Sequence, residues 1–177
     1  MNKILLVGAG HMGASLLKSW AKSNIKNISI VDPILAKKKR KIYNAKIFGS
    51  LDKIKNINDF NVIFFAVKPQ ILNKAIIPYK KLSLKNKLII SIVAGKETKY
   101  FEKEFGENTC VIRTMPNLPA SVNKGVTCLF ANKNVNLSQK KYGMLIFFVD
   151  LIYLIGEIIL ITENPQVQKK NLVEEYY

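Results

Sequence analysis

Three glycines near the N-terminus have a spacing that could bind a phosphate group. They are Gly8, Gly10 and Gly13, and they follow directly after the apolar run 3–7. A first glycine permits a tight turn, a second lets the main chain approach a pyrophosphate, and a third lets the next helix pack closely on the strand. The N-terminus of such a helix offers free N–H groups and a partial positive charge to the phosphates.

One carboxylate has the sequence position of a ribose-binding acid. Asp32 ends the apolar run 28–32 and comes 19 residues after Gly13, close to the offset of roughly 20 at which an acid bonds the adenosine ribose of a dinucleotide. The pattern predicts a dinucleotide site, and the alternative is a glycine-rich turn without a nucleotide. Asp32 favours NAD(H), because a carboxylate repels a ribose 2′-phosphate. The basic run 37–41 could attract that phosphate, or it could be a solvated helix face.

Few other groups offer acid–base or metal chemistry. The one histidine, His11, lies inside the turn, either as a loop residue over the cofactor or as a proton donor, and the sequence shows no partner for it. Cys110 and Cys128 form neither a disulfide framework nor a metal-spaced pair. With a single histidine, a zinc site would lack ligands. We therefore expect no metal.

The elements that must position these residues follow from the alternation along the chain. Apolar runs predict strands at 3–7, 28–32, 45–48, 62–67, 88–93 and 110–114, and helical spacing predicts helices at 14–22, 34–43, 51–60, 71–81 (interrupted near Pro78) and 96–105. The run 3–7 has no polar alternation, which is typical of a strand buried on both faces of a parallel sheet. The fold class is thus α/β: a Rossmann-like, doubly wound, mostly parallel sheet with a glycine-rich phosphate-binding turn after the first strand.

The charge of the chain is strongly basic. There are 28 Lys and Arg against 12 Asp and Glu, a net charge of +16, and 26 of the 28 are lysines. Nucleic-acid surfaces favour the arginine fork, so we interpret the excess as AT-rich coding and expect no nucleic-acid partner. Residues 1–141 hold 26 basic and 7 acidic residues, whereas residues 142–177 hold two and five. The last part of the chain therefore differs in character.

One segment is apolar enough to raise the question of a membrane. Residues 144–161 are almost entirely apolar, but Asp150 and Glu157 interrupt them and Gly156 divides them. Each acid costs about 2.5–3.5 kcal/mol near the centre of a bilayer. We therefore expect a buried helix followed by a strand, and no membrane. The N-terminus lacks the features of a secretory signal, so the expected location is cytoplasmic.

Three motifs at predicted strand ends narrow the interpretation to one family. AVKPQ ends the fourth strand at 66–70, SIVAG ends the fifth at 91–95, and RTMPNLPA follows from the sixth at 113–120. With the N-terminal GAGHMG, this set closely resembles the pyrroline-5-carboxylate reductases over about residues 1–135. The resemblance implies NADPH or NADH as the cofactor. It implies 1-pyrroline-5-carboxylate, a cyclic imine, as the small-molecule substrate, which the family reduces to L-proline in proline biosynthesis.

The resemblance also implies which residues bind each molecule. The cofactor would contact the turn and the ends of the second, fourth and fifth strands: Val7, Gly8, Ala9, Gly10, His11, Met12, Gly13, Asp32, Ala66, Val67, Lys68, Pro69, Ala94 and Gly95. Met115, Pro116 and Asn117 would form the floor of the substrate pocket. Lys68 either touches substrate or packs its stem on the sheet, and Arg113 either meets the substrate carboxylate or ties down the next loop. No catalytic residue is assigned, because hydride transfer depends mainly on orientation.

The resemblance fades towards the C-terminus. In the family a helical domain follows the Rossmann domain, pairs the subunits and completes the substrate site. Residues 138–153 would be the helix before that domain, and 155–159 a short strand. We expect residues 1–162 to form the Rossmann domain and 163–177 to be an unrecognised tail, the truncated or frame-shifted start of the helical domain. The family's homo-oligomers would then lack their dimerisation domain here, and a non-catalytic NAD(P)-binding remnant or regulatory module is the alternative function.

Overall fold

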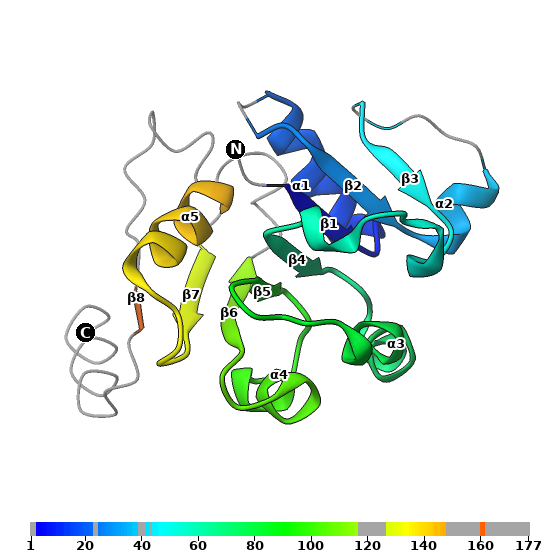
Figure 1. Ribbon diagram of the computed structural model, residues 1–177. Helices are drawn as coiled ribbons and strands as arrows, with labels where there is room; N and C mark the ends of the chain where they lie inside the picture. Colours follow the sequence, from blue (N-terminus) through cyan, green and yellow to red (C-terminus); the bar gives the residue numbers. More distant parts are fainter. Residues whose placement is uncertain are drawn as a thin grey trace.

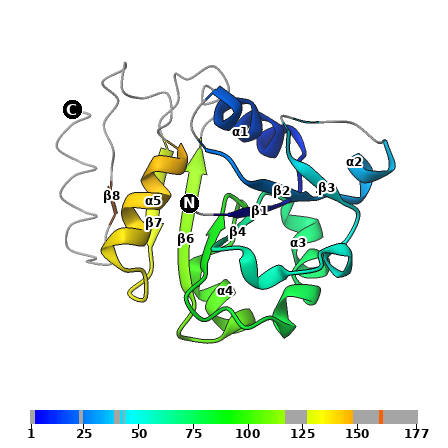
Figure 2. The ribbon, with the colours of Figure 1, turned by 45° about the horizontal axis from the view of Figure 1, so that its top comes forward.

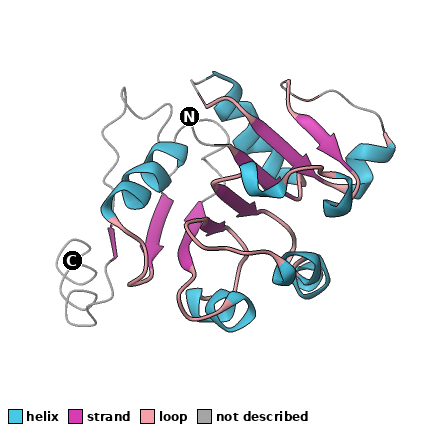
Figure 3. Ribbon diagram, viewed as in Figure 1, coloured by secondary structure: helices cyan, strands magenta, loops and turns pink. Residues whose placement is uncertain are grey.

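The computed structural model describes residues 3–22, 25–38, 42, 44–116, 127–147 and 160–161. Strands and helices alternate along the chain (Figures 1 and 3). In order, the elements are β1 (Ile4–Val7), α1 (His11–Lys22), β2 (Ile28–Val31), α2 (Pro33–Lys37), β3 (Lys46–Phe48), the 3₁₀ helices η1 (Leu51–Lys53) and η2 (Ile57–Asp59), β4 (Val62–Phe65), α3 (Pro69–Ala75), the 3₁₀ helix η3 (Ile77–Lys81), β5 (Leu88–Ser91), α4 (Thr98–Phe105), β6 (Cys110–Pro116), β7 (Thr127–Ala131), α5 (Leu137–Phe147) and β8 (Leu160–Ile161).

The described strands form one sheet, in the order β3-β2-β1-β4-β5-β6-β7-β8. From β3 to β6 all neighbours are parallel. β7 runs antiparallel to β6, and β8 is parallel to β7. The order reverses at β1, which has β2 on one side and β4 on the other, so the predicted doubly wound fold is confirmed. Ligands of such sheets bind at this reversal, beside the ends of the parallel strands; we name that side the carboxyl edge and the opposite side the amino edge.

Helices cover both faces of the sheet, α1 on one and α3 and α4 on the other (Figure 2). Successive strand residues alternate between the two cores: Ile4 and Leu6 pack with α1, whereas Leu5 and Val7 pack with α3 and α4. The indole N–H of the fully buried Trp20 in α1 donates to the main-chain O of Ile146 in α5 at 2.7 Å. That bond joins two helices far apart in the sequence on the same face of the sheet.

Most predicted elements are confirmed, with the predicted break of the 71–81 helix between α3 and η3. The first five strands are shorter than predicted, whereas β6 extends two residues further, to Pro116. The predicted helix 51–60 is wrong in type, since two 3₁₀ helices stand there. Its apolar residues Leu51, Ile54 and Ile57 all pack on the core, and their spacing of three suits the three residues per turn of a 3₁₀ helix. The predicted helix 34–43 ends early, at Lys37.

Two further differences concern the strand after the RTMPN motif and the start of α1. β7 was not predicted. The residues between β6 and β7 have no helical spacing, and they include Pro119 and Gly125. His11 is the first residue of α1 rather than a loop residue. Other predictions lie outside the described residues: Asn117, the basic run from residue 39 to 41, the strand 155–159, and the boundary between 162 and 163 with its tail. Within the described part of the chain, no helix has the length and apolar character to cross a bilayer.

Candidate functional site

Gly8 begins the turn after β1 in a conformation that favours glycine. Its φ is +88°, and its N–H donates to the main-chain O of Val31 at 2.9 Å. A Cβ at Gly8 would lie 2.7 Å from Val67 Cγ1 and 2.9 Å from the main-chain O of Ala66. The glycine turn and the segment that follows β4 are therefore in direct contact, as the doubly wound topology requires.

The other two glycines of the turn have opposite surroundings. A Cβ at Gly13 would lie 2.6 Å from the main-chain O of Gly8, so this glycine lets α1 sit against the turn. A Cβ at Gly10 would meet nothing within 4 Å. The sequence analysis predicts a tight turn at Gly8, an open approach at Gly10 and close packing at Gly13, and the geometry has all three features.

The N-terminus of α1 faces the same open side of the turn. The N–H of Ala14 donates to the main-chain O of Gly10 at 2.8 Å, which makes Gly10 the residue before the helix. The N–H groups of His11, Met12 and Gly13 then have no carbonyl partner within the helix. The first turn of α1 contains no acidic residue, so a helix terminus with a partial positive charge is available to an anion.

Asp32 lies at the end of β2, where the sequence predicts it, and its carboxylate bonds the turn. Oδ2 accepts the N–H of Ala9 at 2.9 Å. Oδ1 accepts the N–H groups of Ile34 and Leu35 at 2.9 and 3.0 Å, as the N-cap of α2. The sequence signal for the cap was Pro33 at the first helical position; the bond to Ala9 has no sequence signal.

The segment after β4 lies beside the turn. The N–H of Ala66 donates to the main-chain O of Val7 at 2.8 Å, and Ala66 is buried. Lys68 is the extended N-cap of α3, with Pro69 as the first helical residue. The Lys68 side chain is exposed and forms no ion pair within the described residues.

The segments after β5 and β6 complete this edge. The main-chain N–H of Val93 donates to the buried Ser91 hydroxyl at 3.1 Å, which bends the chain towards Ala94 and Gly95. Gly95 has φ +70° and open space beside it. On β6, the Arg113 guanidinium lies 3.8 Å from the sulfur of Met115, which is 58% exposed. Arg113 contacts no carboxylate within the described residues.

The strand register places the predicted residues of five strand ends at one edge. Val7 pairs with Val31 and Phe65, Phe65 pairs with Ser91, and Ser91 pairs with Arg113. The predicted contact residues therefore lie together from Asp32 to Pro116, and Asn117 lies outside the described residues. The sequence analysis missed one polar group here: the Thr114 hydroxyl on β6 is buried without a hydrogen-bond partner among the described residues.

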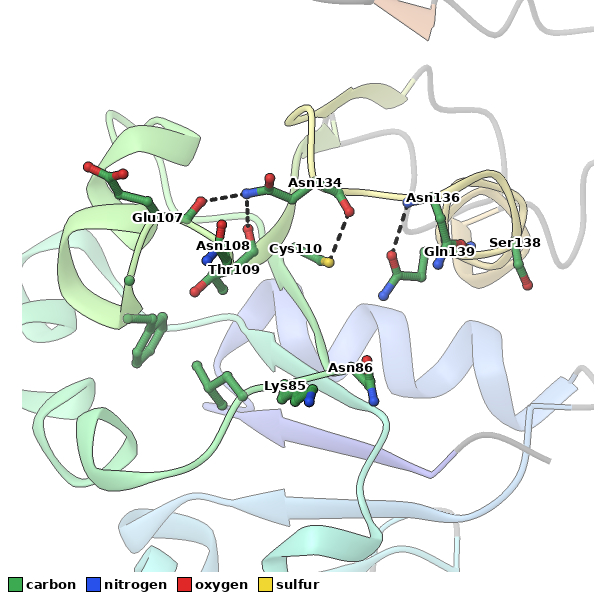
Figure 4. A pocket seen from close by; sticks show the side chains of 13 residues that line it. Lys85, Asn86, Glu107, Asn108, Thr109, Cys110, Asn134, Asn136, Ser138 and Gln139 are labelled. Atoms are coloured by element: carbon green, nitrogen blue, oxygen red, sulfur yellow. Dashed lines mark hydrogen bonds between the residues drawn. The ribbon is translucent and has the colours of Figure 1, made fainter.

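A cavity of about 890 Å³ lies at the opposite, amino edge (Figure 4). Three of the amide side chains that line it already bond main-chain groups of the fold. Asn134 Nδ2 donates to the main-chain oxygens of Glu107 and Thr109 at 2.6 and 3.2 Å, and Asn136 and Gln139 bond each other's main-chain N–H at the start of α5. We therefore place the candidate site at the carboxyl edge. Among the described residues, no three His, Cys, Asp or Glu side chains are close enough together to hold a metal ion.

Comparison with known proteins gives consistent results. Residues 3–95 match the family described as NADP oxidoreductase, coenzyme F420-dependent. The pyrroline-5-carboxylate reductase of Methanosarcina acetivorans is 31% identical over 151 residues, 82% of this chain and 55% of that protein. That of Haemophilus influenzae is 26% identical over 167 residues, 93% of this chain and 59% of that protein.

Solved structures agree with the sequence relatives. A pyrroline-5-carboxylate reductase from Coxiella burnetii superposes with a TM-score of 0.77 at 26% identity, over 95% of this chain and 62% of that chain. The Plasmodium falciparum pyrroline carboxylate reductase with NADP bound gives 0.68 at 31% identity, over 82% of this chain and 54% of that chain.

The motifs, the site and the comparisons support one assignment. The chain spans only about 51–60% of the length of the curated relatives it matches. It nevertheless has the fold, the glycine turn and the strand-end motifs on which the resemblance rests. The chain therefore belongs to this NADP oxidoreductase family and to the pyrroline-5-carboxylate reductases.

Proposed function

We propose that this chain binds NAD(P)H at the glycine turn and reduces 1-pyrroline-5-carboxylate to L-proline. The observation that carries the proposal is the open side of Gly10 between two close-packed glycines, at the N-terminus of α1 and at the reversal of strand order. The substrate is taken from the names of the relatives described above, which are pyrroline-5-carboxylate reductases.

The residues present fit a dinucleotide. The turn from Gly8 to Gly13 would hold the pyrophosphate, and Asp32 would lie at the adenosine ribose. The segments 66–69 and 94–95 would hold the nicotinamide, and their strand ends are neighbours in the sheet. When bound, the reduced nicotinamide supplies a hydride.

For this reaction the protein has to orient the cofactor and the substrate and to supply positive charge near the anionic substrate. Hydride adds to the imine carbon and a proton to the nitrogen, so one C–H and one N–H bond form and the C=N double bond becomes single. A protonated imine is more electrophilic and brings its own proton, which agrees with a chain that has one histidine. Met115, Pro116 and Asn117 would form the pocket floor. Lys68 and Arg113 would contribute positive charge to the edge that receives an anionic substrate.

A second candidate is an NAD(P)-binding module without turnover. The observation that favours it is the share of the relatives that the chain covers, which is 55 to 59% for the two sequences. Both candidates require the same cofactor site. They differ only in whether this chain positions a substrate on it.

Titration and turnover separate the candidates. We expect NADH or NADPH fluorescence to change on binding, with saturation in the micromolar to millimolar range typical of enzymes. We then expect loss of NAD(P)H absorbance when 1-pyrroline-5-carboxylate is added. Binding without turnover by a folded chain would favour the module, and no binding of either dinucleotide would overturn both candidates.

A further inference from the structure

We propose that the Asp32 carboxylate is a fixed link between the glycine turn and α2, and that it makes this chain bind NADH in preference to NADPH. The inference rests on the proposed function, since it concerns the same cofactor. It departs from what the relatives suggest: the matched family is described as NADP oxidoreductase, and the P. falciparum relative was solved with NADP.

The link consists of three main-chain donors on one side chain. Oδ2 receives the N–H of Ala9 in the turn, and Oδ1 receives those of Ile34 and Leu35 in α2, all at 2.9–3.0 Å. Hydrogen bonds to a carboxylate are roughly twice as strong as those between neutral groups. The carboxylate therefore holds the Ala9 amide, and with it the turn, in one orientation.

The main chain of Asp32 is fixed as well. Its N–H donates to the main-chain O of Phe48 at 3.0 Å, at the end of β3. The preceding residue, Val31, accepts the N–H of Gly8 through its main-chain O at 2.9 Å. Because main chain and side chain are both bonded, the carboxylate cannot turn away from a ligand without breaking bonds to the turn or to α2.

A fixed carboxylate discriminates between the adenosine ribose of NADH, which has a free 2′-hydroxyl, and that of NADPH, which carries a 2′-phosphate. An ionised carboxylate has about four acceptor positions, and three are used here. The remaining one can accept a ribose hydroxyl, but a 2′-phosphate has no proton to share at neutral pH and would add negative charge beside negative charge. The Ile34 and Leu35 amides, which a phosphate could bond, are already occupied by Oδ1.

No described cation offsets that repulsion at the start of α2. Lys37 and Lys38 are exposed and lie at the other end of the helix. Five to six residues of helix separate them from Asp32, or about 7–9 Å along the axis at 1.5 Å per residue. Their charges act there through solvent, and because the Debye length is about 8 Å at physiological ionic strength, they are partly screened.

The experiment measures NADH and NADPH dissociation constants for the wild type, Asp32→Asn and Asp32→Ser, with Glu107→Gln as the control. Asn keeps the oxygen that caps α2 but turns an NH₂ group towards the Ala9 N–H. Ser caps helices well but is too short to keep both sets of bonds. Glu107→Gln removes the same charge at the exposed amino edge (Figure 4).

We expect the wild type to bind NADH at least tenfold more tightly than NADPH. In both Asp32 variants the NADPH-to-NADH affinity ratio should rise about tenfold or more, while NADH itself binds several-fold more weakly because the turn has lost its link. The control should keep both constants and their ratio. A merely structural Asp32 would weaken both cofactors equally and leave the ratio unchanged, which would overturn the proposal.

The wild type alone also tests the inference without any variant. NADPH binding as tight as NADH binding, or tighter, would overturn the preference and leave the proposed function standing. Binding of neither dinucleotide would instead overturn the proposed function.

Discussion

The two edges of the sheet use polar groups in opposite ways. At the amino edge, asparagine side chains bond main-chain groups and close the structure: Asn132, 1% exposed, receives the Val111 N–H and donates to the Thr109 O and to Glu102. At the carboxyl edge the first N–H groups of α1 are left for a ligand, beside the open Gly10. A cavity alone does not locate a functional site, because several amide side chains that line the cavity of Figure 4 already bond main-chain groups.

The largest expected effect is the loss of dinucleotide binding at the carboxyl edge in a variant that still folds. Gly10→Val should weaken dinucleotide binding at least a hundredfold, because the side chain fills the space through which the pyrophosphate approaches. The free protein has room for it, since a Cβ there meets nothing within 4 Å. Loss of a good N-cap residue should cost no more than about 1 kcal/mol of unfolding free energy.

Gly10→Ala is the matched control for that experiment, since it loses the same cap with a smaller side chain. It should give an intermediate affinity at the same stability, measured by cofactor titration and thermal unfolding. Unchanged affinity in Gly10→Val would show that the pyrophosphate does not bind at this turn.

The second prediction concerns a substitution at the amino edge, which should lower the stability of the fold and leave cofactor affinity nearly unchanged. Asn132→Leu removes acceptor and donor from a buried position and leaves the Val111 N–H and the Thr109 O without the Asn132 side chain. The Thr109 O keeps its bond from Asn134 Nδ2 at 3.2 Å, but the Val111 N–H loses the Asn132 acceptor. An unsatisfied buried group costs about 1–3 kcal/mol, so we expect the unfolding free energy to fall by roughly that amount. The NADH dissociation constant of the folded variant should change less than twofold. A large loss of affinity at native stability would mean that the two edges are coupled.

The sequence could predict more of the carboxyl edge than of the amino edge, for a physical reason. The roles of Gly8, Gly10 and Gly13 depend on a local turn between a strand and a helix, so their spacing is enough to assign them. The bonds of Asn132 join residues 21 to 30 positions apart, and no local pattern encodes them. Asp32 shows both cases: its position was predictable from its distance to Gly13, but its bond to Ala9 exists only because β1 and β2 are neighbours.

Element types followed the same division. The buried parallel strands were predictable from apolar runs that alternate with helices, whereas the composition of the antiparallel β7 does not reveal its direction. The 3₁₀ helices η1 and η2 stand where a helix was predicted, because tertiary packing of Leu51, Ile54 and Ile57 decides the local geometry. Local turns and the parallel strands were therefore predictable, whereas the direction of β7 and the side-chain bonds between distant residues were not.

The smallest expected effect is a loss of stability, and we test it by replacing one lysine at each edge. Lys87 lies before β5 with 7% of its surface exposed, and its ammonium donates to the main-chain O of Asn58 and Phe60 at 3.0 and 2.7 Å. Lys68 is exposed and forms no ion pair within the described residues. Lys87→Met should cost about 1–2 kcal/mol at neutral pH because two carbonyls lose a donor, whereas Lys68→Met should change stability by less than about 0.5 kcal/mol.

The pH dependence of the stability of the wild type and of Lys87→Met gives the sharper test. Burial lowers the pKa of Lys87, and the nearby charge of Asp59 only partly opposes this. Below the lowered pKa both folded and unfolded chains carry the proton, and the fold bears the full cost of a buried charge. As pH rises from that pKa to 10.5, the unfolded chain binds more protons than the folded one, so this group makes the fold more stable. The stability difference between wild type and Lys87→Met, measured by denaturant unfolding, should therefore widen from pH 7 to pH 10. A difference that narrows with rising pH would mean that the Lys87 ammonium is stabilised as a cation by its carbonyl partners more than it is penalised by burial.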